Sequence, residues 1–161
     1  MINTVLFDCS GSMSLPVSGN LINPTAPDGI RMDLGFKLLN HLFKKNYIHK
    51  GTPIVAFDHS IRGGVTFNLI NPVYEMRTGP FINEVVTLET LRMSNKFVFD
   101  LFDPNRGTNI YDALAAYPEG DILLITDEHP KIVEKAIKNL GRKNVIVAII
   151  DEREPSGMYY L

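Results

Sequence analysis

The stretch Phe7-Asp8-Cys9-Ser10-Gly11-Ser12-Met13 is the key to interpreting the rest of the chain. Before it, residues 2–7 are apolar and rich in β-branched side chains, which predicts a short buried strand. This strand ends at Asp8, and hydroxyl side chains follow at Ser10 and Ser12. These side chains present hard oxygen atoms on one tight loop, and such atoms suit Mg²⁺ or Mn²⁺ better than Zn²⁺. Taken alone, the stretch fits equally well a turn whose side chains only bond the nearby backbone.

The composition is that of an ordinary soluble globular protein. The chain has 161 residues, of which 45% are hydrophobic and 21% charged, so we expect one domain spanning residues 1–161. A net charge of −2 without a large basic cluster gives no indication of a nucleic-acid surface. No apolar run is long enough to cross a bilayer, and residues 1–3 lack the basic start of a signal peptide. Because Cys9 is the single cysteine, we expect no intramolecular disulfide and a cytoplasmic location.

A second stretch, residues 121–127, repeats the pattern of an apolar strand that ends at an acid. An amphipathic helix follows, with Pro130 in its first turn and Gly141 at its end. Residues 145–150 predict a final apolar strand, and residues 158–161 predict one more short strand.

Between these two stretches the chain predicts a loop, a helix and a hairpin. Residues 13–29 are rich in Pro and Gly and predict a long loop. Apolar residues then recur at helical spacing, which predicts a helix over residues 31–46. Residues 52–58 and 65–67 predict two paired strands, with Gly63-Gly64 at the corner of the hairpin.

The segment before the second acid has a less regular pattern. Between residues 81 and 102 the spacing favours a helix, although residues 84–88 fit an extended strand equally well. Residues 109–117 predict a short helix whose N-cap is Thr108 or Asn109. Capping is the simplest role for Thr108 when it is considered alone.

Apolar strands that alternate with amphipathic helices predict an α/β fold with three layers. We expect a doubly wound, mostly parallel sheet with helices on both faces and one antiparallel edge hairpin. Ligands bind such sheets at the carboxyl ends of the strands, near the point where the strand order reverses. If the strands ending at Asp8 and Asp127 are neighbours, the two acids lie side by side, with Ser10, Ser12 and Thr108 on adjacent loops. Crowded carboxylates repel unless a cation or a shared proton relieves them, and the hydroxyl groups favour a cation.

These residues also carry a resemblance to a known family. Asp8-Cys9-Ser10-Gly11-Ser12, then Gly107-Thr108, then Thr126-Asp127 resembles the von Willebrand factor A (vWA) domain. Its metal-ion-dependent adhesion site (MIDAS) has the form D-x-S-x-S, a distant Thr and a distant Asp. The resemblance covers most of residues 1–150 and implies a Rossmann-like vWA fold. It implies that Ser10 and Ser12 bind the ion directly and Thr108 directly or through water. Asp8 and Asp127 would then act close to the ion, often through water.

The resemblance implies a binding function instead of catalysis. The family usually leaves one coordination position of the Mg²⁺ or Mn²⁺ ion for water or for a carboxylate from a partner. We therefore expect a module for protein–protein interaction that recruits a Glu or Asp of another protein. The main alternative is a metal-dependent hydrolase or phosphotransferase that uses Asp8 and Asp127 around the same ion.

Two further alternatives stay open on the sequence. A Ser-His-Asp hydrolase would use Ser10 or Ser12 with His59 or His129, but the nucleophile-elbow pattern is absent because the serines flank a single glycine. An exposed histidine at a helix start explains His129 more simply. The other alternative keeps the whole motif as turn chemistry and predicts no effect of metal.

Overall fold

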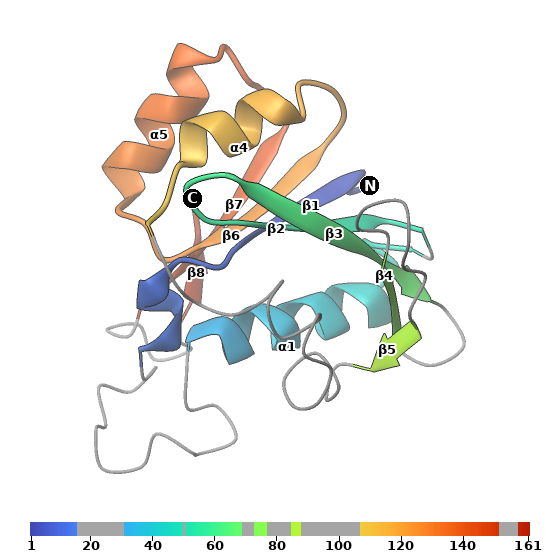
Figure 1. The fold of residues 1–161 in the computed structure, drawn as a ribbon. Coiled ribbons are helices and arrows are strands. Elements are labelled where there is room, and N and C mark those ends of the chain that lie inside the picture. Colours follow the sequence, from blue (N-terminus) through green and yellow to red (C-terminus); the bar gives the residue numbers. More distant parts are fainter. Residues whose placement is uncertain (16–30, 50, 69–72, 77–84, 88–106, 152–157) are drawn as a thin grey trace.

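The computed structural model describes residues 1–15, 31–49, 51–68, 73–76, 85–87, 107–151 and 158–161 (Figure 1). Its strands are β1 (Thr4–Asp8), β2 (Pro53–Phe57), β3 (Ile61–Asn68), β4 (Val73–Met76), β5 (Val85–Thr87), β6 (Ile122–Thr126), β7 (Val145–Ile150) and β8 (Met158–Tyr160). They form one sheet in the order β5-β4-β3-β2-β1-β6-β7-β8. The pairs β1/β2, β1/β6 and β6/β7 are parallel, so the centre of the sheet is parallel as predicted.

Helices cover both faces of this sheet, which confirms the predicted three-layer, Rossmann-like α/β fold. The helices of the described residues are α1 (Arg31–Lys44), α4 (Ile110–Ala116), α5 (Pro130–Asn139) and the short 3-10 helix η1 (Gly11–Ser14). Figure 1 shows α1 on one face and α4 with α5 on the other. The predicted helices at residues 31–46 and 109–117 and the helix that follows Pro130 are all present.

The core consists of two apolar layers because successive strand residues point to opposite faces of the sheet. In β1, Val5 and Phe7 belong to the layer under α1, whereas Leu6 belongs to the layer under α4 and α5. The α1 layer is packed closely at Gly35. A Cβ atom there would lie 2.6 Å from Cζ of Phe7, so glycine allows this helix to lie close to β1.

The strand order reverses beside β1. The chain passes from β1 through α1 to β2 on one side, and later enters β6 and β7 on the other side. The gap between the carboxyl ends of β1 and β6 is therefore the topological switch point, where open α/β sheets bind their ligands. This confirms that the strands ending at Asp8 and Asp127 are neighbours.

The predicted hairpin is present, but its corner lies elsewhere. The chain turns at Asp58–Ser60, where the Asp58 carboxylate accepts a hydrogen bond of 3.0 Å from the Ser60 amide. Gly63 and Gly64 lie inside β3, paired with Ala56 and Val55. The prediction was wrong because an aspartate turn reverses the chain earlier, and the glycines lie instead next to a register shift in the antiparallel pair.

The sheet also has more antiparallel strands than the single hairpin expected. β4 and β5 continue the antiparallel edge beyond β3, and β8 adds an antiparallel strand at the opposite edge. The helix favoured between residues 81 and 102 is wrong at residues 85–87, which form β5 and pair with β4. The β-branched run Val85-Val86-Thr87 explains this result, because such side chains favour strands. The rest of that segment and most of the predicted loop at 13–29 lie outside the described residues.

Within the described ranges, none of the helices has the length and apolar character required to cross a membrane.

Candidate functional site

Asp8 is completely buried at the end of β1 and is held by neutral hydrogen-bond donors. One carboxylate oxygen accepts a bond of 2.8 Å from the Ser10 amide, and the other accepts a bond of 2.6 Å from the Thr126 hydroxyl. Thr126 is the last residue of β6, and its Oγ1 also accepts a bond of 3.0 Å from the Glu128 amide. The carboxylate of Asp8 therefore links the loop after β1 to the loop after β6.

Burial controls the protonation of Asp8. Loss of hydration raises the pKa of this carboxyl from 3.8 to about 6. The bonds from Thr126 and Ser10 act in the opposite direction, and the neighbouring charge of Asp127 adds to the rise. A cation close to these carboxylates would favour the ionised form of Asp8.

The two serines of the motif converge because the chain turns into η1 directly after β1. Oγ of Ser10 and Oγ of Ser12 lie 3.3 Å apart. Ser10 is buried and precedes the helix as its N-cap residue, and its carbonyl accepts a bond of 3.0 Å from the Met13 amide. The side chain of Met13 is buried in the core layer under α1, which anchors the turn that carries Ser12.

Thr108 reaches the same region through a loop that is fastened to β2. The Asn109 amide donates a bond of 2.7 Å to the carbonyl of Asp58, the buried residue that follows β2. Asn109 also caps α4, because its side chain accepts a bond of 3.0 Å from the Asp112 amide. Of the two predicted caps, Asn109 is thus the one used, and the hydroxyl of Thr108 is not needed for that role.

Asp127 lies between β6 and α5, and it is paired with a cation from α1, the helix on the other face of the sheet from α5. Nη1 of Arg31, the first residue of α1, lies 2.7 Å from Oδ2 of Asp127. The side chains are 14% and 3% exposed, respectively, so the ion pair is almost buried. The Arg31 amide donates a bond of 3.0 Å to the Leu15 carbonyl, which joins the start of α1 to the end of η1.

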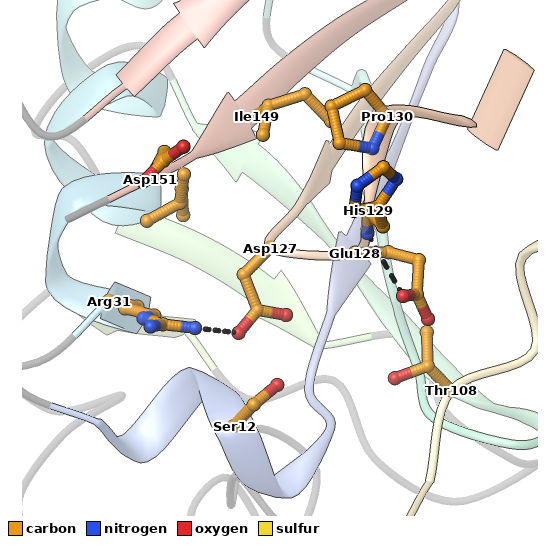
Figure 2. A pocket seen from close by; sticks show the side chains of 10 residues that line it. Ser12, Arg31, Thr108, Asp127, Glu128, His129, Pro130, Ile149 and Asp151 are labelled. Carbon is orange, nitrogen blue, oxygen red and sulfur yellow. Dashed lines mark hydrogen bonds and ion pairs between the residues drawn. The ribbon is translucent and has the colours of Figure 1, made fainter. Parts of the chain in front are cut away.

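A pocket of about 550 Å³ opens at this end of the sheet (Figure 2). Its polar lining includes Ser12, Arg31, Thr108, Asp127, Glu128 and His129. In Figure 2, Asp127 lies between Arg31 on one side and Thr108 on the other, with Ser12 on η1 below it. Asp8 and Ser10 are buried next to this pocket and are linked by hydrogen bonds to Thr126 and Ser12.

The sequence thus identified residues that the fold gathers at one place: Asp8, Ser10, Ser12, Thr108 and Asp127. It missed Arg31, since an arginine at a helix start gives no sign that its partner lies 96 positions away. It also missed the role of Thr126 in binding Asp8. The pairing of β1 with β6 could have suggested that role, because Phe7 lies opposite Ile125.

This donor set fits a hard divalent cation. Within the described part of the chain, no three His, Cys, Asp or Glu side chains gather in an arrangement that could hold a metal ion. The oxygen atoms available are the hydroxyls of Ser10, Ser12 and Thr108 and the carboxylates of Asp8 and Asp127. Mg²⁺ is commonly held by a few protein oxygen atoms together with water, and this set meets that requirement.

Comparisons with known proteins add one structural likeness. No protein-family model matches the chain, and no curated protein matches its sequence. A solved structure that is similar is that of the conserved hypothetical protein BatB from Bacteroides thetaiotaomicron, with 17% identity and a TM-score of 0.47. The match covers 91% of this chain and 63% of the BatB chain, so this chain spans less than two thirds of the BatB length.

Proposed function

We propose that this protein is a binding module that depends on a divalent cation. Mg²⁺ or Mn²⁺ would be held by Ser10, Ser12 and Thr108, with Asp8 and Asp127 close to it, and would bind a Glu or Asp carboxylate of a partner protein. The observation that carries the proposal is the convergence of these residues beside the switch point of the sheet. Their order along the chain, which resembles the vWA metal site, supports the same function.

The open pocket above these residues supports a role in binding a partner. A cation with an incomplete set of protein ligands attracts anionic groups from outside, and the pocket gives such a group access. Ser12 and Thr108 line this pocket, whereas Asp8 and Ser10 are buried. Asp8 would thus supply charge from within the fold, and Asp127 and the hydroxyls of Ser12 and Thr108 would face the ligand.

We propose binding and not catalysis because the histidines have other contacts. Nδ1 of His129 accepts a bond of 3.2 Å from the Lys131 amide, as expected for the N-cap of α5. His59 is exposed and lies 3.3 Å from Asp58, an acid at the end of a different strand from Asp127. The capping contact favours a structural role for His129.

Thermal unfolding with EDTA, Mg²⁺, Mn²⁺ and Ca²⁺ tests the proposal. A ligand that binds only the folded state raises the free energy of unfolding by about 2.7 kcal/mol at 100 times its Kd. We expect stabilisation of the wild type by Mg²⁺ or Mn²⁺, and loss of this effect in Ser12→Ala. Ser14→Ala is the matched control, because Ser14 lies on the same short helix and donates its hydroxyl hydrogen bond to the Gly11 carbonyl. Absence of stabilisation at roughly tens of millimolar metal would overturn the proposal.

A further inference from the structure

The ion pair between Arg31 and Asp127 places a protein cation inside the candidate metal site. The guanidinium lines the same pocket as Ser12 and Thr108, and it is bonded to one of the two acids that would serve the ion. Figure 2 shows the Arg31 side chain extended toward Asp127 from the start of α1. Because both side chains are almost buried, water screens their individual charges poorly, so the guanidinium acts strongly on a charged group that enters the pocket.

Arg31 changes the net charge of the site. The carboxylates of Asp127, Glu128 and Asp151 line the same pocket, and Asp8 is buried next to it. Arg31 makes this site one unit more positive, both when it is empty and when it holds a divalent ion. It therefore lowers the attraction of the site for the ion and raises the attraction of the filled site for an anion.

We propose that Arg31 makes the ion and the carboxylate ligand bind cooperatively. The guanidinium weakens binding of the divalent ion alone, since it repels the ion and is bonded to Asp127. The same charge strengthens binding of an anion once the ion is in place. Arg31 is therefore a residue that favours an anionic ligand, such as a carboxylate, over a neutral one. This inference rests on the proposed function.

Calorimetric titrations of the full chain test this role with two probes, Mg²⁺ alone and acetate added to the Mg²⁺-saturated protein. In Arg31→Gln we expect Mg²⁺ to bind about tenfold more tightly and acetate about tenfold more weakly than in the wild type. The opposite directions are the diagnostic result, because a merely damaged fold would weaken both. Arg31→Lys keeps the charge and should follow the wild type in both titrations. Lys131→Gln is the control, because it removes the same charge from an exposed residue at the start of α5.

The outcomes separate this inference from the proposed function. If no variant binds Mg²⁺, the proposed function fails and the coupling fails with it. If the wild type binds Mg²⁺ but Arg31→Gln binds both probes as the wild type does, only the role of Arg31 is overturned. Thermal unfolding establishes that each variant is folded. If Arg31→Gln does not fold, Arg31→Met, which keeps more apolar packing volume, replaces it in the same titrations.

Discussion

The ends of β1 and β6 show the same sequence pattern, an apolar strand followed by an acid, but the fold stabilises the two acids differently. Asp8 is completely buried and accepts hydrogen bonds from an amide and a hydroxyl, which are neutral donors. Asp127 is paired with the guanidinium of Arg31. The comparison shows that the local pattern fixes where an acid lies, whereas the side chains that bind it, Thr126 for Asp8 and Arg31 for Asp127, come from distant parts of the chain.

The largest expected effect comes from breaking the ion pair between Asp127 and Arg31. In EDTA, Arg31→Gln should lower the free energy of unfolding by about 3 to 4 kcal/mol, because it leaves a carboxylate that is only 3% exposed without its cation. Urea unfolding measures this loss. The double variant Arg31→Gln/Asp127→Asn removes both charges and should recover most of the lost stability. If the double variant loses the sum of the stabilities lost in Arg31→Gln and in Asp127→Asn alone, the two side chains do not stabilise each other.

The second prediction concerns the pH dependence of stability that Asp8 causes. Because the pKa of Asp8 is raised to about 6, the folded protein binds this proton more tightly than the unfolded chain does. In EDTA, the contribution of Asp8 to stability is complete below about pH 4 and is lost as the pH rises through about 6, a total loss of about 3 kcal/mol.

Urea unfolding of the wild type and Asp8→Asn across this pH range measures the effect. The difference in unfolding free energy between them should change over this interval, because the asparagine does not titrate. A constant difference across the interval would contradict a raised pKa. Saturating Mg²⁺ should shift the interval to lower pH in the wild type, since the ion favours the ionised carboxylate.

The smallest expected effect comes from removing the hydrogen bond that the uncharged Thr126 side chain donates to Asp8. Thr126→Val keeps the shape of the side chain but removes the 2.6 Å hydrogen bond to the buried carboxylate. We expect a loss of about 1 to 2 kcal/mol in unfolding free energy, measured in EDTA at pH 7. Thr108→Val is the control, because this half-buried threonine lines the pocket and its loss should change the stability by less than about 0.5 kcal/mol. Equal losses of unfolding free energy in Thr126→Val and Thr108→Val would show that the hydrogen bond to Asp8 does not stabilise the fold.

The parallel centre of the fold could be predicted because its signals are local. Apolar runs gave β1, β2, β6 and β7, and helical spacing gave α1 and α5. The antiparallel edge was harder to predict. A strand as short as Val85–Thr87 is too short to show an alternation of apolar and polar residues in its sequence. It is defined by its pairing with β4, which the sequence alone does not reveal. The glycine pair predicted the hairpin corner at Gly63-Gly64. The chain turns earlier instead, where the Asp58 carboxylate accepts a hydrogen bond from the Ser60 amide.

The sequence predicted that the acids and serines lie together at one end of the sheet, but it did not predict their electrostatics. The motif indicated Asp8, Ser10 and Ser12 from spacing alone, and the strand ends indicated Asp127. The Arg31 pairing depends on how α1 lies against the sheet, and this arrangement depends in part on the close contact of Gly35 with Phe7. No pattern of neighbouring residues carries that information.

The bond between Thr126 and Asp8 has a further consequence for how the protein would respond to a ligand. It joins residues 118 positions apart, and the candidate ion site lies across the same junction between β1 and β6. An ion bound there would act as a cross-link at the centre of the sheet, not as a clamp on one loop. Because the ion would bridge the loops that follow β1 and β6, its binding would oppose separation of these two strands, and their amides should exchange hydrogen with solvent more slowly. Occupancy of the site would then slow exchange throughout the parallel core, so that a surface ligand reports on the stability of the whole domain.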